Sequence, residues 1–251
     1  MNTEEYERMY HLEDSYWWYV GRHCLVESIL RSRFGAPNPL SISERTILDV
    51  GCGTGAMSAR LTKWGRVVSA DFSPLALHFT QRRGLTSMVR ADAMKLPLAT
   101  GQFDVLIAMD MLEHLPDDAA ALSEFYRVLK PGGTMIATVP AYPHLWSDHD
   151  VAAMHFRRYL RPELLSRVRA AGFRVEKISH TMTTLYPIVA LQRRLSARKP
   201  IKSHYSHTSI PLFPAPVNFG LKKLLAVENS VARRVNLPFG VTLLTIAKKA
   251  G

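Results

Sequence analysis

Cysteine is scarce in this sequence, and long apolar runs are absent from it. The 251 residues include two cysteines, Cys24 and Cys52, and neither lies in a CxxC or zinc-ligand spacing. A disulfide framework is therefore excluded, and a reducing compartment is expected. No stretch approaches the roughly 18 uncharged apolar residues that a membrane-spanning helix needs. The acidic N-terminus also lacks the basic and apolar regions of a signal peptide, so the sequence predicts a cytoplasmic protein.

Acidic side chains are nearly missing from the last third of the chain. The whole sequence carries 32 Lys and Arg against 21 Asp and Glu, a formal net charge of +11. Residues 181–251 hold eleven of the basic residues and a single acid, Glu228. Such a segment can face a phospholipid surface, a nucleic acid or an anionic substrate, or it can form a solvated surface.

The remaining composition and pattern are those of a folded α/β chain. Apolar residues make up 47% and charged residues 21%, with 14 Gly and 15 Pro, which excludes collagen-like, mucin-like and disordered chains. Short apolar runs alternate with segments of helical composition, which indicates a mostly parallel sheet with helices on both faces. We expect strands at residues 46–50, 67–70, 89–91, 103–109, 134–139, 174–179 and 241–247, and helices at 56–64, 74–83, 118–129 and 162–170.

Two segments depart from this alternation. Residues 1–34 have the pattern of an amphipathic helix and lead into a connector at 35–43. About sixty residues separate the last two strands, more than an α/β connection needs, and they include a predicted amphipathic helix at 219–235. We therefore divide the chain into an N-terminal helical lid or extension (1–42), a core (43–180), a basic insertion (181–238) and the last strand of the core (239–251).

The most informative motif is ILDVGCGTG at residues 47–55. Glycines at a strand-to-helix turn let the backbone bend sharply and let a ligand approach the main chain at the carboxyl edge of the sheet. Three glycines at alternating positions, with Asp49 two residues before the first, predict a cofactor site. The GxGxG spacing differs from the GxGxxG of dinucleotide-binding turns, so a pyrophosphate cradle is the poorer match.

This motif resembles motif I of the class I S-adenosylmethionine-dependent methyltransferases. The later segments FDVLIAMDMLEHL (103–115) and LKPGGT (129–134) follow in the order typical of that family. The whole chain further resembles bacterial type-11 methyltransferases of glycan and lipid pathways. The resemblance implies a Rossmann-like, doubly wound, mostly parallel seven-stranded sheet with an antiparallel last strand.

The resemblance also implies how S-adenosyl-L-methionine is held. The glycine turn would hold the methionine part, Asp71 at the end of the second strand would accept hydrogen bonds from the ribose hydroxyls, and Asp92 would contact the adenine amino group. Taken singly, Asp71 or Asp92 could instead be a helix cap. The full implied set is Asp49, Gly51, Gly53, Gly55, Asp71, Phe72, Asp92, Ala93 and Met109.

Candidate catalytic and acceptor-binding residues follow the fourth and fifth strands. Methyl transfer from a sulfonium is an in-line displacement, and an oxygen or nitrogen acceptor also needs a base. His114, His149 and His155 are the candidate bases, because imidazole titrates near neutrality. His149 lies between two aspartates, which could orient it or cap a turn. Acceptor-binding candidates are Tyr142, Arg157, Arg158 and Tyr159, of which the adjacent arginines could bind a carboxylate or phosphate or simply lie on the surface.

The aromatic run YWWY at residues 16–19 predicts an N-terminal lid. Consecutive aromatic residues cannot all face one core, so some should cover a ligand. We expect Trp17, Trp18 and Arg22 to contact the acceptor, although packing of the helix on the sheet is the alternative.

Asp110, Glu113, His114 and His155 are candidate metal ligands. Their order is similar to an acid-x-x-Glu-His pattern with a downstream His in some metal-assisted methyltransferases, and oxygen plus imidazole ligands suit a divalent ion. Many family members carry a Glu-His pair there without metal, so we expect none.

Together these features predict a methyltransferase that acts on a small-molecule or lipid- or glycan-linked acceptor, possibly anionic, at oxygen. A peripheral membrane contact through the basic insertion would agree with that, and a monomer or homodimer is expected. The alternatives are a nucleic-acid methyltransferase, which lacks the Asn/Asp-Pro-Pro-aromatic signature of base methylation, an NAD-dependent oxidoreductase and a non-catalytic binding protein.

Overall fold

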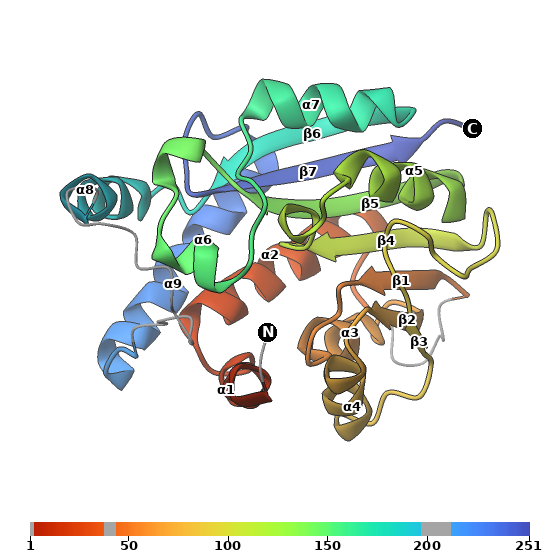
Figure 1. Cartoon of the computed structure of the whole chain (residues 1–251), viewed down its shortest axis with the longest axis horizontal. Coiled ribbons are helices and arrows are strands. Elements are labelled where there is room, and N and C mark those ends of the chain that lie inside the picture. Colours follow the sequence, from red (N-terminus) through yellow and green to blue (C-terminus); the bar gives the residue numbers. More distant parts are fainter. Residues whose placement is uncertain (1–2, 38–43, 197–211) are drawn as a thin grey trace.

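The computed structural model describes residues 3–37, 44–196 and 212–251. A seven-stranded sheet with the order β3-β2-β1-β4-β5-β7-β6 forms its centre (Figure 1). The strands are β1 (Thr46–Val50), β2 (Arg66–Asp71), β3 (Met88–Arg90), β4 (Phe103–Met109), β5 (Leu129–Pro140), β6 (Phe173–Thr181) and β7 (Thr242–Lys249). All neighbouring pairs are parallel except those of β7, which is antiparallel to both β5 and β6. The predicted doubly wound sheet with an antiparallel last strand is confirmed.

The central strands are buried on both faces, as their continuous apolar runs require. The helices around the sheet are α2 (Trp17–Phe34), α3 (Ala56–Leu61), α4 (Pro74–Arg82), α5 (Asp118–Val128) and α7 (Arg161–Ala170). Ile47 and Ile107 pack with α2 and α3 on one face, whereas Leu48 and Leu106 pack with α5 and α7 on the other. This alternation follows from the two-residue period of a strand.

The N-terminal helical segment is divided rather than continuous. Helix α1 (Thr3–Leu12) packs on α4 through a small cluster that includes Tyr6 and Phe79. After a turn, α2 places Leu25 and Val26 in the main core. The N-terminal segment therefore contributes one helix to the core and a second that lies over the loop after β1.

The segment before β7 contains helices that the sequence pattern only partly predicted. Helix α9 (Ala215–Arg234) packs on α2, and Asn229 Nδ2 donates to the Gly21 carbonyl at 2.8 Å. Helix α8 (Tyr186–Ser196) was not expected, and neither was the short α6 (Asp148–Ala152), which lies between β5 and α7. Three basic residues of the predicted insertion, Arg198, Lys199 and Lys202, lie outside the described residues. Within the described ranges, no helix combines the length and apolarity required to cross a bilayer.

Candidate active site

The turn between β1 and α3 has a conformation that requires glycine. Gly51 and Gly55 have φ angles of 71° and 83°, in the left-handed region that side chains rarely adopt. A Cβ at Gly55 would lie 2.9 Å from the Thr80 Cα, and one at Gly51 would lie 2.8 Å from the Met111 Cβ. The turn thus presents bare main chain at the carboxyl edge of the sheet, which is where α/β folds bind ligands.

Asp71 ends the neighbouring strand β2 beside this turn. Its Oδ2 accepts a hydrogen bond from the Gly53 N–H, and its Oδ1 accepts one from the Ser73 N–H, both at 2.9 Å. Each oxygen keeps a further lone pair, so the carboxylate can also accept from a ligand diol. Burial raises the pKa of Asp71 above its ordinary value. A turn without side chains beside a carboxylate acceptor fits a nucleoside cofactor such as S-adenosylmethionine.

The other residues of the implied cofactor set differ in how well they are placed. Asp49 is 2% exposed and accepts a hydrogen bond from the Ser58 hydroxyl at 2.6 Å, which fastens α3 to β1. Burial raises the pKa of Asp49 to about 6. We therefore assign Asp49 a role in shaping the turn rather than a direct ligand contact. Phe72 is exposed, and Asp92 Oδ1 accepts from the Met94 N–H at 2.9 Å in a tight turn. Ala93 is buried and Met109 is half-buried at the end of β4.

Two of the three candidate bases meet after β4. The His114 and His155 rings lie edge to face with centroids 4.6 Å apart. Part of the His114 side chain is exposed, and desolvation of the rest, followed by the neighbouring His155, lowers the pKa of His114. The His149 ring lies farther away, 6.3 Å from that of His155. Burial lowers its pKa as well.

Glu113 joins these two histidines. Its side chain is 1% exposed, and its Oε2 has no hydrogen-bond partner among the described residues. Burial, followed by the charge of Asp110, raises the pKa of Glu113 well above its ordinary value. Glu113, His114 and His155 offer ligand atoms that all lie within 4.8 Å of one another, an arrangement that could hold a divalent cation.

Asp150 orients His155 and not the adjacent His149. Its Oδ1 lies 3.0 Å from His155 Nδ1 and 2.7 Å from Arg158 Nε, while its Oδ2 lies 3.0 Å from Arg158 Nη2. Although burial opposes ionisation, the hydrogen bonds from His155 and Arg158 hold the pKa of Asp150 below its ordinary value. Asp150 also accepts from Ser147 at the start of α6 in a capping box. The prediction that Asp150 orients His149 is therefore wrong. Asp150 instead caps the turn at the start of α6, which was the alternative.

The two arginines and the tyrosine after His155 form hydrogen bonds and ion pairs with other groups of the protein. Tyr159 is fully buried and its hydroxyl donates to Asp118 at 2.7 Å, so it is not available to an acceptor. Arg157 donates to the Pro116 carbonyl at 2.6 Å and pairs with Asp118. Arg158 donates hydrogen bonds to Asp150 and to the Ala141 carbonyl. The predicted acceptor contact is therefore wrong for the buried Tyr159, whereas for Arg157 and Arg158, which bind Asp118, Asp150 and backbone carbonyls, it stays a prediction.

Helix α2 crosses the end of β4 through Arg22. Its guanidinium forms an ion pair with Asp110, which has a left-handed backbone with φ 45°, and lies 4.2 Å from the centroid of the Trp18 ring. The Nε1 of Trp17 is buried without a hydrogen-bond partner among the described residues. Tyr142 lies in an aromatic stack, with its ring 5.1 Å from that of His180 and 5.0 Å from that of His144. Trp18 and Arg22 thus lie beside Asp110 at the end of β4.

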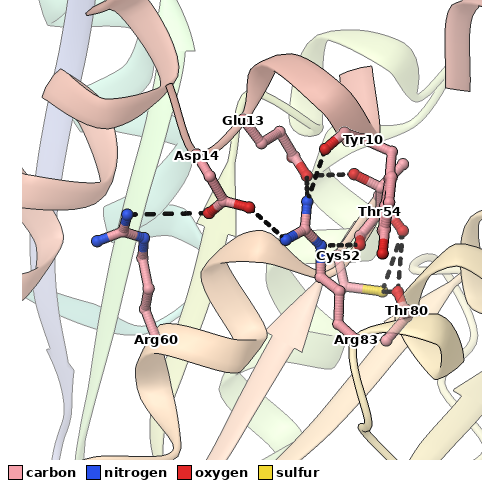
Figure 2. A network of polar contacts seen from close by, with 9 residues as sticks. Tyr10, Glu13, Asp14, Cys52, Thr54, Arg60, Thr80 and Arg83 are labelled. Atoms are coloured by element: carbon pink, nitrogen blue, oxygen red, sulfur yellow. Dashed lines mark hydrogen bonds and ion pairs between the residues drawn. The ribbon is translucent and has the colours of Figure 1, made fainter. Parts of the chain in front are cut away.

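A polar network fastens the turn between α1 and α2 to the glycine turn (Figure 2). Arg83 donates from Nε to the Thr54 carbonyl at 2.8 Å and from Nη1 to Asp14 at 2.6 Å. Its Nη2 donates to the Tyr10 carbonyl and to Glu13, which also accepts from the Thr54 hydroxyl. The ε-methyl of Met9 lies 3.0 Å from where a Cβ on Gly53 would be. Helix α1 therefore covers the glycine turn.

The network predicts a pH-dependent stability. Burial raises the pKa of Glu13 from 4.5 to about 7. The native state then binds more protons than the unfolded state between these values, so the free energy of unfolding falls as the pH rises through this range. We expect Glu13→Gln to raise the free energy of unfolding relative to wild type, and to raise it by on the order of 2 kcal/mol more at pH 8 than at pH 4. Urea unfolding at both pH values measures this, and Glu7→Gln on the exposed side of α1 is the control; equal shifts for both variants would contradict the expectation.

The sequence pattern predicted the histidines of the site but not the side chains that form hydrogen bonds and ion pairs around them. Asp150 lies in a run of polar residues in which no spacing marks it as the partner of His155. Glu13 and Arg83 are 70 residues apart, and only the fold brings them together. Arg22 was expected to contact an acceptor, and its ion pair with Asp110 had no sequence signal.

Comparisons with known proteins agree with this geometry. A methyltransferase-domain family model matches residues 48–137. The ubiquinone biosynthesis O-methyltransferase of Xanthomonas oryzae pv. oryzae is 31% identical over 179 residues, covering 63% of this chain and 74% of that protein. A solved complex between the Haloferax volcanii Trm112 methyltransferase activator and a putative methyltransferase matches with a TM-score of 0.62 at 22% identity, covering 98% and 95% of the two chains.

A third comparison concerns the cofactor. Phosphoethanolamine N-methyltransferase 2 of Haemonchus contortus, solved with phosphomonomethylethanolamine and S-adenosylhomocysteine, has a TM-score of 0.55 at 18% identity and covers 90% of this chain and 57% of that one. The chain belongs to the class I S-adenosylmethionine-dependent methyltransferases. It is accordingly an enzyme, and S-adenosylmethionine is its cofactor. This sets aside the oxidoreductase and the binding protein as alternatives.

Proposed function

We propose that the protein methylates a hydroxyl oxygen on a small, lipid-linked or glycan-linked acceptor. The observation that carries this proposal is the Asp150–His155 pair, which lies at the same edge of the sheet as the glycine turn and Asp71. A hydroxyl acceptor must lose a proton as it becomes methylated, and an imidazole oriented by a carboxylate is suited to take it. The O-methyltransferase name of the Xanthomonas relative supports an oxygen acceptor.

Each part of the chain has a separate task in this mechanism. When bound, S-adenosylmethionine supplies an electrophilic methyl group on a sulfonium. The glycine turn and Asp71 hold the cofactor at the tips of β1 and β2. Asp150 accepts the Nδ1–H of His155, which leaves Nε2 to receive the acceptor proton. The ring of His114 packs beside it, and the covering by α1 and α2 excludes water, which favours in-line transfer.

The experiment is a methylation assay with the purified protein. Calorimetry should detect binding of S-adenosylmethionine and none of NAD. Incubation with a panel of phenolic and alcoholic acceptors, free and lipid-linked, followed by mass spectrometry, should give a product heavier by one methyl group. Methylation of amines alone would contradict the oxygen assignment, and methylation of RNA or DNA would favour the nucleic-acid alternative.

The lid predicts a measurable effect on cofactor binding. Trp18→Leu removes the ring under the Arg22 guanidinium and loosens α2 over the site. A cation–π contact of this kind contributes roughly 1 kcal/mol, so the KM for S-adenosylmethionine should rise about fivefold. Steady-state kinetics checks this, with Trp64→Leu, in the buried core between α3 and β2, as the control for loss of a tryptophan. An unchanged KM in the Trp18 variant would remove the lid from the mechanism.

A further inference from the structure

Helix α9 has an apolar stripe on the side away from its packed face. Its buried residues Leu225, Asn229 and Ala232 face the protein, as expected from contact with α2. Leu224, Val227 and Val231 recur at helical spacing and are 39%, 66% and 45% exposed. A monomeric surface rarely carries such a stripe without a partner.

Helix α8 repeats the arrangement at the same end of the molecule (Figure 1). Ile188, Leu191 and Leu195 lie on one face and are each at least 60% exposed. The turn before α8 is tied to α9, because the Thr183 and Thr184 N–H groups donate to Glu228 at 2.9 and 3.0 Å. We name these six exposed apolar residues of the two helices the α8–α9 face.

The charged side chains that α8 and α9 expose all have one sign. Arg194, Lys223 and Arg234 are exposed beside the apolar stripes. Glu228 is the single acidic side chain in residues 181–251, and it is 7% exposed and hydrogen-bonded to the turn before α8. Among the described residues of α8 and α9, the charges exposed beside the stripes are therefore basic.

We propose that the α8–α9 face docks on the surface of an anionic lipid bilayer. Apolar side chains flanked by lysine and arginine enter the interface of a bilayer and place their charges beside anionic headgroups. A second copy of the chain would bring like charges together across the same face, which opposes self-association. Charge complementarity thus selects an anionic lipid surface.

The docked face adjoins the proposed acceptor site, and this step rests on the proposed function. The Tyr186 hydroxyl at the start of α8 lies 3.3 Å from His144 Nε2, and the Tyr186 ring packs on that of Tyr142. On the inner side of α8, Arg193 has its pKa lowered by burial and then by Arg158, the partner of Asp150. A bilayer held by α8 therefore lies next to the loop that carries the candidate base, and the acceptor class that this favours is a membrane-embedded lipid with a hydroxyl headgroup.

Vesicle co-sedimentation of the full chain tests the docking. Wild type should sediment with vesicles of phosphatidylglycerol and phosphatidylcholine, less at high salt, and not with phosphatidylcholine alone. Each removed basic charge should weaken partitioning about fivefold, so Lys223→Gln with Arg234→Gln should lower it by more than tenfold. Val227→Asp with Val231→Asp should abolish it by placing charge in the apolar stripe.

Matched variants keep the result interpretable. Arg169→Gln and Ser166→Asp make the same kinds of change on the exposed side of α7 and should leave vesicle binding as in wild type. Circular dichroism and S-adenosylmethionine calorimetry on every variant report folding and the cofactor site independently of lipid. Vesicle binding by the Val227 and Val231 double variant equal to that of wild type would overturn the proposal, as would sedimentation with neutral vesicles to the same extent. A dimer that the same substitutions dissociate would assign the face to a second copy instead.

Discussion

His155→Ala is expected to lower kcat by about 10² to 10⁴-fold while leaving the affinity for S-adenosylmethionine unchanged. The substitution removes the imidazole that Asp150 orients at 3.0 Å, so the acceptor hydroxyl loses its proton acceptor. The glycine turn and Asp71 lie on other strands and keep their geometry. Single-turnover kinetics with the identified acceptor, together with calorimetry of cofactor binding, measures the two effects separately.

A control separates proton transfer from cation binding at the same cluster. Glu113, His114 and His155 could also hold a divalent ion, so turnover of wild type is measured after chelation. We expect chelation to leave kcat unchanged, in agreement with the expectation of no metal. A loss that added Mg²⁺ or Zn²⁺ restores would instead assign the three side chains to a cation, and a His155→Ala variant of normal kcat would contradict both roles.

Asp71→Ala is expected to weaken S-adenosylmethionine binding by about tenfold to a hundredfold. It removes the carboxylate that accepts from the Gly53 N–H and that, in our proposal, accepts from the ribose hydroxyls. Both losses act before chemistry, so the dissociation constant should rise and kcat at saturating cofactor should change little. Isothermal calorimetry and saturation kinetics test this.

The matched change for Asp71 is Asp117→Ala. Asp117 also accepts a backbone N–H hydrogen bond, from Ala120 at 3.0 Å, but it caps α5 on the exposed surface. This control should lower stability by about 1 kcal/mol and leave the dissociation constant unchanged. If the two variants bind the cofactor equally well, Asp71 has no direct role in holding it.

Most of the strands could be predicted because each one is marked by the apolar pattern of its own few residues. The strands are short apolar runs, of which β1, β2 and β4 end at glycine or aspartate, and the predicted ranges agree with the observed ones to within a few residues. The exception at β5 has a physical reason: the strand extends from Leu129 through the Pro-Gly-Gly stretch, and its pairing with β4 shifts register between Phe103 and Val105. A bulge of this kind keeps ladder contacts where composition predicts a turn.

The site was predicted less completely because its contacts are long-range. Asp71 and the glycine turn follow from strand ends, whose places are set by topology. The partners of Arg158 and Arg22 depend on long-range packing, and these arginines, expected to meet an acceptor, form ion pairs with Asp150 and Asp110. A sequence pattern can show that a charged side chain needs a partner, but it does not say which one.

The N-terminal segment has two roles, since it covers the cofactor site and also forms part of the hydrophobic core. Helix α2 carries Trp18 and Arg22 at its start and buries Val26 and Leu30 against the sheet further along. Truncation of residues 1–34 would strip one wall from the hydrophobic interior along with the covering itself. Deletion ahead of the turn at residues 13–16 removes α1 alone, so that shorter cut exposes the glycine turn and leaves the scaffold whole.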